Sequence, residues 1–327
     1  MTDTLLDVRN LRVSIPTDHG VLNAVRGVDL TVQAGRTLCL VGESGCGKSL
    51  TSMALMGLLP RHAQTGNDRM TLLGGDYSGK PPSAWAKMRG RSLSMIFQDP
   101  MTSLNPTLTV GRQLTEGVMY LDGLGRAAAE ARAVELLDRV GIARPALRLS
   151  QYPHQFSGGQ RQRLMIAMAL MGRPRLLIAD EPTTALDVTI QAQILALLGE
   201  LQRDLGLGLL LITHDLGVVA AIADEVAVMY AGRIVERGPA EAVFSRPCHP
   251  YTAGLIAAIP VPGRTPRGSK LPAIPGRVPG LIGAFAGCAF RERCQMAMPV
   301  CETAPPPRAE REAGHMAECH LLAAGAA

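Results

Sequence analysis

The chain has 327 residues, of which 47 % are hydrophobic, 19 % are charged and only 3 % are aromatic, and its formal net charge is +5. The length suits about two domains, and the composition excludes a disordered or fibrous chain. Because the charge excess is small, the apolar runs are short and no signal segment opens the sequence, we expect a cytoplasmic chain with no nucleic-acid partner.

Short apolar runs mark the expected strands. Residues 1–35 alternate in short runs and predict an antiparallel layer. Continuous apolar runs at 37–41, 176–179 and 209–213 are typical of central strands covered on both faces, and each precedes a helical pattern. Strand, loop and helix in repeated order predict an α/β fold with a parallel sheet and helices on both sides.

Two further segments belong to this first part of the chain. Residues 127–140 predict a strong helix inside a helical insertion of about 100–165, which interrupts the strand pattern. Residues 226–236 predict a hairpin, because two apolar runs flank a short turn that contains glycine.

Proline marks a boundary near residue 240. Ten of the 23 prolines precede residue 239, and the other thirteen lie between Pro239 and Pro307. We therefore predict a compact domain over residues 1–240, followed by an irregular extension over residues 241–327. Such an extension has few apolar residues with which to build a core of its own.

One glycine-rich segment matches the pattern G-x-x-x-x-G-K-S/T at every fixed position. It consists of Gly42, Glu43, Ser44, Gly45, Cys46, Gly47, Lys48 and Ser49. Glycines allow several backbone N–H groups to point at one anion, and the positive end of the following helix adds to the attraction. Lys48 would hold the β- and γ-phosphates of ATP, and the Ser49 hydroxyl would bind Mg²⁺.

Two carboxylates, Asp180 and Glu181, follow the apolar run at 176–179. Ligands of a parallel sheet bind at the C-terminal ends of its strands. Asp180 suits a Mg²⁺ contact through water, and Glu181 could accept a proton from an attacking water. Beside a phosphate loop, we favour these roles over a solvated strand end or a helix N-cap.

A third motif, Phe156-Ser157-Gly158-Gly159-Gln160, precedes a long apolar helix. Ser157 is a good N-cap, and the two glycines leave backbone N–H groups accessible to an anion. Alone, this motif indicates an ordinary capped helix. Together with the phosphate loop and the acidic pair, it resembles the Leu-Ser-Gly-Gly-Gln signature of the ATP-binding cassette (ABC) family, with Phe156 in place of leucine.

The remaining motifs of that family follow in the family's order. Gln98 matches the glutamine loop, Asp187 of Ala185-Leu186-Asp187 matches the short loop after the acidic pair, and His214 matches the switch histidine. The resemblance covers about residues 5–240. It implies a P-loop NTPase with a RecA-like parallel sheet core, an antiparallel β subdomain and a helical insertion.

The resemblance also implies how these residues would act. Two ATP-binding domains would face each other head to tail, so that each ATP lies between the phosphate loop of one domain and the signature motif of the other. Glu181 would be the general base, His214 would contact the γ-phosphate, and Gln98 would sense Mg²⁺ and the attacking water. The residues that would complete the pocket of the facing domain are Ser157, Gly158, Gly159, Gln160 and Asp187.

One position departs from the family pattern. The family usually stacks adenine on an aromatic residue about 23 positions before the first glycine of the phosphate loop, and His19 occupies that position. Imidazole stacks more weakly than tyrosine or tryptophan, so an adenine contact and a plain turn residue both remain open for His19.

The stretches 99–106 and 249–252 resemble the dipeptide and oligopeptide importer ATPases, a subfamily that also serves nickel and metal-chelate uptake. This resemblance implies an ATP-hydrolysing motor subunit at the cytoplasmic face of the membrane, with di- or oligopeptides as cargo. Its partners would be a second ATPase subunit, commonly a distinct homologue, two membrane permease subunits and an extracytoplasmic binding protein. Nickel or metal-chelate import and a homodimer remain alternatives, as does a soluble ABC ATPase of the DNA-repair or translation type.

Four cysteines gather near the C-terminus: Cys288, Cys294, Cys301 and Cys319. In a reducing compartment, such a group indicates a metal site before a disulfide framework. The residues alone leave a 4Fe-4S cluster, zinc and free thiols open. Some importers of the subfamily carry an iron–sulfur cluster on a similar pattern, so the resemblance favours the 4Fe-4S cluster as a cofactor beside ATP and Mg²⁺.

Overall fold

The computed structural model describes residues 3–184, 186–259, 272–283 and 285–325. The strands are β1 (Thr4–Thr17), β2 (Gly20–Gln33), β3 (Thr37–Val41), β4 (Gln64–Gly66), β5 (Arg69–Leu72), β6 (Gly75–Asp76), β7 (Leu93–Ile96), β8 (Leu176–Asp180), β9 (Gly208–Thr213), β10 (Glu225–Tyr230), β11 (Arg233–Pro239), β12 (Arg308–Glu312) and β13 (His315–Glu318). The α-helices are α1 (Lys48–Met56), α2 (Pro100–Ser103), α3 (Val110–Asp122), α4 (Arg126–Arg139), α5 (Pro145–Arg148), α6 (Gly158–Leu170), α7 (Val188–Leu205), α8 (Leu216–Ile222), α9 (Ala240–Ser245), α10 (Pro250–Ala257), α11 (Val300–Thr303) and α12 (His320–Ala323). The 3₁₀ helices are η1 (Pro82–Lys87), η2 (Pro153–Gln155) and η3 (Arg291–Arg293).

The chain forms two compact units, each assembled from several stretches. The first unit holds the described residues of Met1–Leu6, Val32–Thr37 and Thr71–Ile212. The second unit holds the described residues of Asp7–Thr31, Leu38–Met70 and Thr213–Ala327.

In the first unit, β7, β8 and β9 are parallel neighbours. Leu93 pairs with Leu176, and Leu176 pairs with Gly208. Every residue of these strands is buried, which explains why β8 and β9 were predicted from continuous apolar runs, whereas β7 was not predicted.

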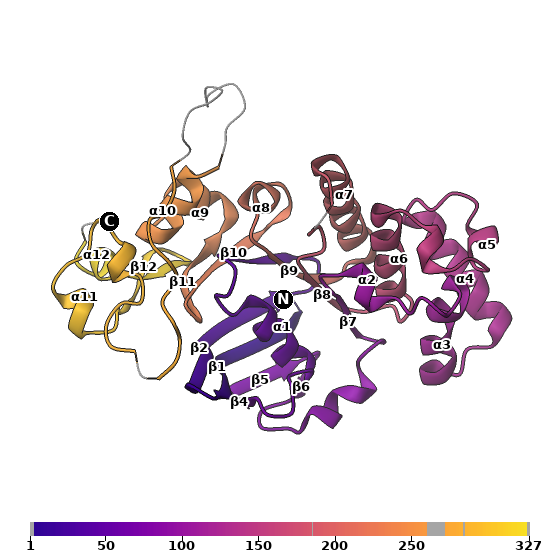
Figure 1. Ribbon diagram of the computed structural model, residues 1–327, viewed down its shortest axis with the longest axis horizontal. Helices are drawn as coiled ribbons and strands as arrows, with labels where there is room; N and C mark the ends of the chain where they lie inside the picture. Colours follow the sequence, from indigo (N-terminus) through magenta and orange to yellow (C-terminus); the bar gives the residue numbers. More distant parts are fainter. Residues whose placement is uncertain (1–2, 185, 260–271, 284, 326–327) are drawn as a thin grey trace. The chain divides into compact units, whose positions relative to one another are not determined.

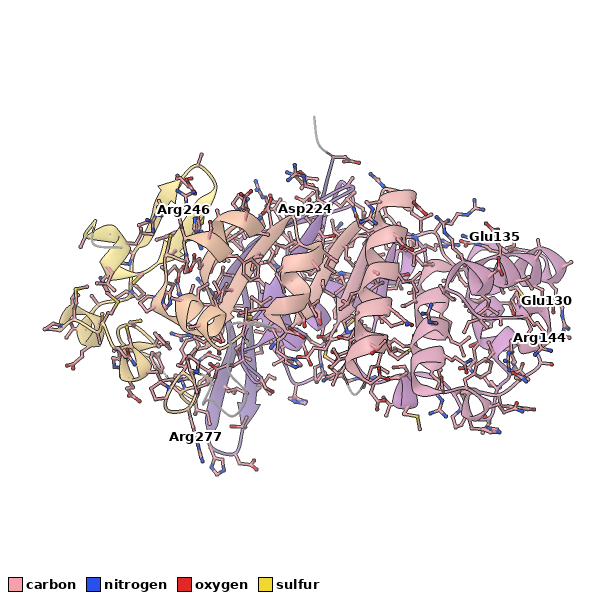
Figure 2. The ribbon with its side chains drawn as sticks, turned by 90° about the horizontal axis from the view of Figure 1, so that it is seen from above. Glu130, Glu135, Arg144, Asp224, Arg246 and Arg277 are labelled. Atoms are coloured by element: carbon pink, nitrogen blue, oxygen red, sulfur yellow. The ribbon has the colours of Figure 1, made fainter. Side chains whose placement is uncertain are left out.

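A group of helices follows in the same unit, where α3, α4, α5 and α6 pack against one another (Figure 1). The predicted helix at 127–140 is α4, which carries Glu130 and Glu135 (Figure 2). Helix α6 begins at Gly158, earlier than its apolar run, because Ser157 caps it. The predicted helical insertion is therefore confirmed.

In the second unit, neighbouring strands follow the order β12-β13-β11-β10-β3. Strands β3 and β10 are parallel, with Val226 opposite Cys39, and the predicted hairpin is the antiparallel pair β10–β11. In a separate sheet, β4 pairs antiparallel with β1, with Arg12 opposite Gly66. The early residues therefore form strands of a second layer, as predicted.

The extension contains more regular structure than its sequence pattern indicates. Strand β13 pairs antiparallel with both β11 and β12, so it extends the sheet of the second unit. The segment was not predicted as strands, because Arg308–Glu312 consists almost entirely of charged residues and lacks apolar alternation. Among the described residues, none of the helices is long and apolar enough to cross a bilayer.

Candidate nucleotide site

The phosphate loop joins β3 to α1 and depends on glycine at two positions. A Cβ atom on Gly42 would lie 2.2 Å from the Met229 carbonyl oxygen, and one on Gly47 would lie 2.4 Å from that of Ala24. Gly47 also has a φ of 109°, which favours glycine. Backbone crowding therefore fixes both glycines of the pattern, while Ser44 and Gly45 are exposed at the tip of the loop.

The Lys48 ammonium group lies within this loop. Its Nζ donates to the carbonyl oxygens of Gly42 at 2.7 Å and Glu43 at 3.0 Å, and the residue is only 4 % exposed. The nearby Cys46 thiol is also enclosed, and burial raises its pKa. A cation wrapped by a glycine-rich turn at a helix N-terminus is suited to bind phosphate.

Two residues of the extension contact the same loop. The Tyr251 hydroxyl accepts a hydrogen bond from the Glu43 N–H at 3.0 Å, and Arg293 forms an ion pair with the Glu43 carboxylate at 3.0 Å. Both residues are buried, and Arg293 Nη1 also lies 3.4 Å from the Tyr230 hydroxyl. These contacts were not predicted from the sequence, because sequence patterns do not indicate that distant residues such as Glu43 and Arg293 will be in contact.

The first unit brings Gln98 and Glu181 together after β7 and β8. Gln98 Nε2 donates to Glu181 Oε2 at 3.3 Å, and the Thr184 hydroxyl donates to the same oxygen at 2.9 Å. Glu181 has a φ of 45°, and its N–H donates to the Ile212 carbonyl oxygen at 2.9 Å. A strained, half-buried carboxylate beside an amide is suited to orient and deprotonate a water. Asp180, at the end of β8, is 3 % exposed.

The signature residues start α6 through reciprocal hydrogen bonds. The Ser157 hydroxyl accepts from the Gln160 N–H at 3.3 Å, and the Gln160 side chain accepts from the Ser157 N–H at 3.1 Å. A Cβ atom on Gly159 would lie 2.8 Å from a methyl carbon of Ile190, whose N–H donates to Asp187 at 3.0 Å. The signature glycines and Asp187 therefore lie near each other, at the starts of α6 and α7, whereas Ala185 lies outside the described residues.

Ser49 lies at the second position of α1, and two further predicted residues are histidines of the second unit. His214 follows directly after β9 and is exposed. His19 is exposed between β1 and β2, where its N–H donates to the Thr17 hydroxyl at 3.3 Å. Their roles toward the γ-phosphate and adenine stay predictions.

The predicted 4Fe-4S cluster on Cys288, Cys294, Cys301 and Cys319 is wrong. Among the described residues, the group of side chains that could hold a metal ion is Glu236, Cys248 and His315, and it includes none of the four.

Comparison with known proteins places these residues in a family. The family model described as "ABC transporter" matches residues 25–184, and that of the "Oligopeptide/dipeptide transporter, C-terminal region" matches residues 235–301. Both descriptions concern transporters, and neither names an iron–sulfur protein.

Two curated relatives are similar over nearly their whole length. The oligopeptide transport ATP-binding protein OppD of Salmonella typhimurium is 50 % identical over 93 % of this chain and 90 % of its own. The dipeptide transport ATP-binding protein DppD of Bacillus subtilis is 49 % identical over 98 % of this chain and 95 % of its own.

The solved dimeric structure of the ATP-binding cassette MJ0796, bound to ADP and Pi, supports the fold. It has a TM-score of 0.63 and 22 % identity, and the match covers 72 % of this chain and 98 % of that one. The predicted P-loop NTPase fold class is thereby confirmed. The family match and the 50 % identity with OppD show that the chain belongs to the ABC transporter family of ATP-hydrolysing ATP-binding subunits.

Proposed function

We propose that this chain is the motor subunit of an ABC importer that couples ATP hydrolysis to the uptake of di- and oligopeptides. The observation that carries the proposal is the 49–50 % identity with peptide-transport ATP-binding proteins, which extends over 93–98 % of the chain. Residues 235–301 match a family model for the C-terminal region of oligopeptide and dipeptide transporters. This match favours peptides over nickel or metal chelates as the cargo. The same match favours a transport subunit over a soluble ABC ATPase, because the matched region is described as part of a transporter.

We propose the domain division that the proline distribution suggests. Residues 1–240 would form the nucleotide-binding domain, with a helical subdomain at about 100–165, and residues 241–327 would form the extension. The separate family matches at 25–184 and 235–301 support this division.

Within the nucleotide site, the phosphate loop would bind ATP through its backbone N–H groups. The Lys48 ammonium would exchange its bonds to the Gly42 and Glu43 carbonyls for the β- and γ-phosphates. The available side-chain donors are hard oxygen atoms, which fit Mg²⁺: the Ser49 hydroxyl, the Asp180 carboxylate and the Gln98 amide. When bound, Mg²⁺ would neutralise part of the charge on the phosphates.

In hydrolysis, Glu181 would take the proton of the attacking water, while Gln98 and Thr184 keep its carboxylate in position. His214 would contact the γ-phosphate. His19, which lies exposed, would contact adenine.

The signature motif would serve the ATP of a facing subunit. Val188 is 80 % exposed beside Asp187, so an apolar side chain is available where a partner would contact the start of α7. The facing subunit would be a second ATPase, a distinct homologue. The two ATPase subunits would bind peripherally at the cytoplasmic face of the membrane. They would act together with two permease subunits within the membrane and with an extracytoplasmic binding protein.

The proposal is tested by reconstituting the chain with its permease, second ATPase and binding protein in liposomes. ATP should drive the uptake of labelled di- or oligopeptides, and Lys48→Ala should abolish uptake while the complex still assembles. Uptake of nickel or a metal chelate in place of peptide would refute the assigned cargo. Full ATPase activity of a chain that assembles with no permease would refute the transport role.

A further inference from the structure

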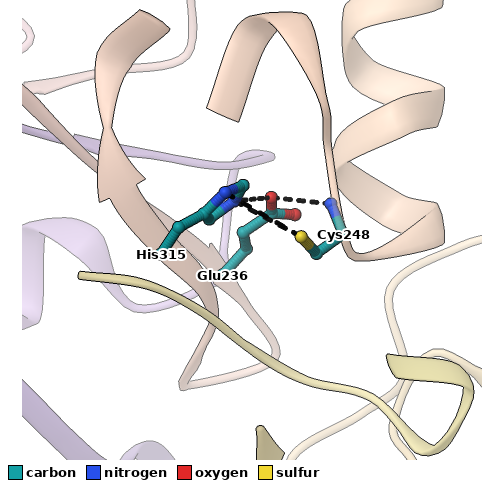
Figure 3. A group of neighbouring side chains, drawn as sticks. All are labelled: Glu236, Cys248 and His315. Carbon is teal, nitrogen blue, oxygen red and sulfur yellow. Dashed lines mark hydrogen bonds and ion pairs between the residues drawn. The ribbon is translucent and has the colours of Figure 1, made fainter. Parts of the chain in front are cut away.

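A buried group of three potential metal ligands lies in the second unit, away from the phosphate loop in the sequence. Glu236 comes from β11, Cys248 from the segment between α9 and α10, and His315 from the first position of β13 (Figure 3). Their exposed fractions are 1 %, 3 % and 0 %. The group therefore joins two segments of the extension to the neighbouring strand β11 in a place that solvent does not reach.

The Glu236 carboxylate is held rigidly by the backbone. Its Oε1 accepts from the Cys248 N–H and its Oε2 from the His249 N–H, both at 2.8 Å. His315 Nε2 lies 2.8 Å from Oε1 and 3.5 Å from the Cys248 sulfur. A carboxylate has about four lone-pair sites, so these bonds leave capacity for a further partner.

We propose that Glu236, Cys248 and His315 form a zinc site. A thiolate, an imidazole and a carboxylate are the donors that Zn²⁺ binds, whereas Mg²⁺ and Ca²⁺ prefer oxygen alone. The three ligand atoms lie within 4.8 Å of one another, so small side-chain movements would bring them to a common ion. One thiolate and one carboxylate would also balance the charge of the ion, which matters in a dry interior.

The surroundings resemble the outer shell of a zinc site. Glu312 Oε1 lies 3.9 Å from His315 Nδ1, which places a carboxylate near the second ring nitrogen, as zinc-bound histidines commonly have. Arg311 Nη1 lies 3.9 Å from the Cys248 sulfur, where its positive charge would favour a thiolate.

The proton balance of binding is simple. In the metal-free tautomer that bonds to Glu236, the ring proton would lie on Nε2, and the Cys248 thiol would keep its own proton. On binding, the Cys248 proton is released to solvent, and the imidazole changes tautomer so that Nδ1 carries its proton toward Glu312. The three side chains would supply three of the four ligands of tetrahedral zinc, and a water enclosed with the ion would supply the fourth.

The same three residue types could form a nucleophilic triad with a cysteine. Here the sulfur is enclosed, so no substrate could reach it, and a structural ion is the use that burial permits. Such an ion would stabilise a segment that has little apolar core, because metal binding adds to the free energy of folding.

The test uses the full-length chain, freed of metal with a chelator and titrated with Zn²⁺ and, separately, with Co²⁺. We expect one tightly held Zn²⁺ per chain by elemental analysis after gel filtration. We also expect a thiolate-to-cobalt charge-transfer band in the near ultraviolet and a higher melting temperature with zinc. Cys248→Ala should lose the band and the temperature shift.

A matched control separates this site from the C-terminal cysteines. A variant with Cys288, Cys294, Cys301 and Cys319 all changed to serine should keep the zinc and the cobalt band. The proposal is overturned if the wild-type chain shows no thiolate–cobalt band, or if the band persists in Cys248→Ala and disappears in the four-serine variant. Absence of the band from the wild-type chain overturns the proposal even if a variant fails to fold.

Discussion

The proposed role of Glu181 in hydrolysis depends on how the fold positions its carboxylate. Its carboxylate is positioned by Gln98 and Thr184, and its backbone has a φ of 45°. We expect Glu181→Gln to reduce ATP hydrolysis by about 10²- to 10⁴-fold, which is the effect that loss of the proposed general base would have. Binding of ATP should persist, as measured by equilibrium binding of a fluorescent analogue.

Glu200→Gln is the matched control for that variant, because Glu200 is exposed on α7 and should leave turnover unchanged. Near-normal hydrolysis by Glu181→Gln would show that another group takes the proton.

Tyr251 offers a second test at this scale. Its hydroxyl satisfies the Glu43 N–H at the entry to the phosphate loop, and Tyr251→Phe removes that oxygen while the ring stays in place. We expect the KM for ATP to rise several-fold with a smaller change in kcat, and stability to fall by about 1 kcal/mol. Steady-state kinetics and denaturant unfolding measure the two effects.

Tyr120→Phe serves as the comparison, since Tyr120 is 89 % exposed on α3. A Tyr251→Phe enzyme with unchanged KM would mean that the loop keeps its shape without the extension.

At the scale of the residue, the sequence allowed site residues to be predicted where they belong to a local motif. The glycines, Lys48, Asp180 and Glu181 could be selected from the sequence, because a phosphate loop and an acidic strand end are local patterns, and their roles toward ATP stay predictions. The Glu43–Arg293 ion pair could not, because its two members are adjacent only after folding. The Glu236–Cys248–His315 group was not predicted for the same reason, because its three members are far apart in the sequence.

At the scale of the element, α6 depends on its first residue. Ser157 and Gln160 satisfy each other's backbone N–H groups. We expect Ser157→Ala to reduce the free energy of unfolding by about 1 kcal/mol, whereas Ser157→Thr should keep most of it. Urea unfolding without nucleotide measures this, and equal losses in both variants would show that the cap contributes nothing specific.

Strand β12 makes a pH-dependent contact with β2. Burial pushes the pKa of Asp29 upward, but hydrogen bonds from Arg308 and from the Asn10 N–H outweigh it, so the pKa lies below its ordinary value of 3.8. The ionised form therefore stabilises the fold above that value, and its contribution is lost as the pH falls through the folded pKa.

We accordingly expect Asp29→Asn to lower the melting temperature at pH 7, and the difference from wild type to shrink below pH 4. Arg308→Gln should behave in the same way, because it removes the other partner. A difference that stays constant from pH 7 to pH 3 would contradict the ionic origin of the effect.

Elements were predictable in proportion to how apolar they are. Strands β3, β8 and β9 are entirely buried and gave clear apolar runs. Strands β12 and β13 are held by charges, such as the Arg233–Glu318 ion pair at 2.7 Å, and left no apolar pattern.

At the scale of the whole molecule, the chain carries two anion-binding motifs that would each serve a different ATP. We expect Glu181→Gln to associate in the presence of ATP with the second ATPase subunit, because bound nucleotide adds its binding energy to the interface. Analytical ultracentrifugation with and without ATP would measure this. A further change of Gly159→Arg in the same chain should prevent association, and ATP-independent complexes of equal strength would contradict a shared pocket.

The contacts of Glu43 with Tyr251 and Arg293 have a practical consequence for anyone who wishes to study the ATPase alone. Truncation after residue 240 would leave an apparently intact nucleotide-binding fragment whose glycine-rich turn has lost a hydrogen-bond acceptor and an ion-pair partner. Turnover measured on such a fragment would describe a loosened enzyme, and it would underestimate the affinity for ATP in the intact subunit.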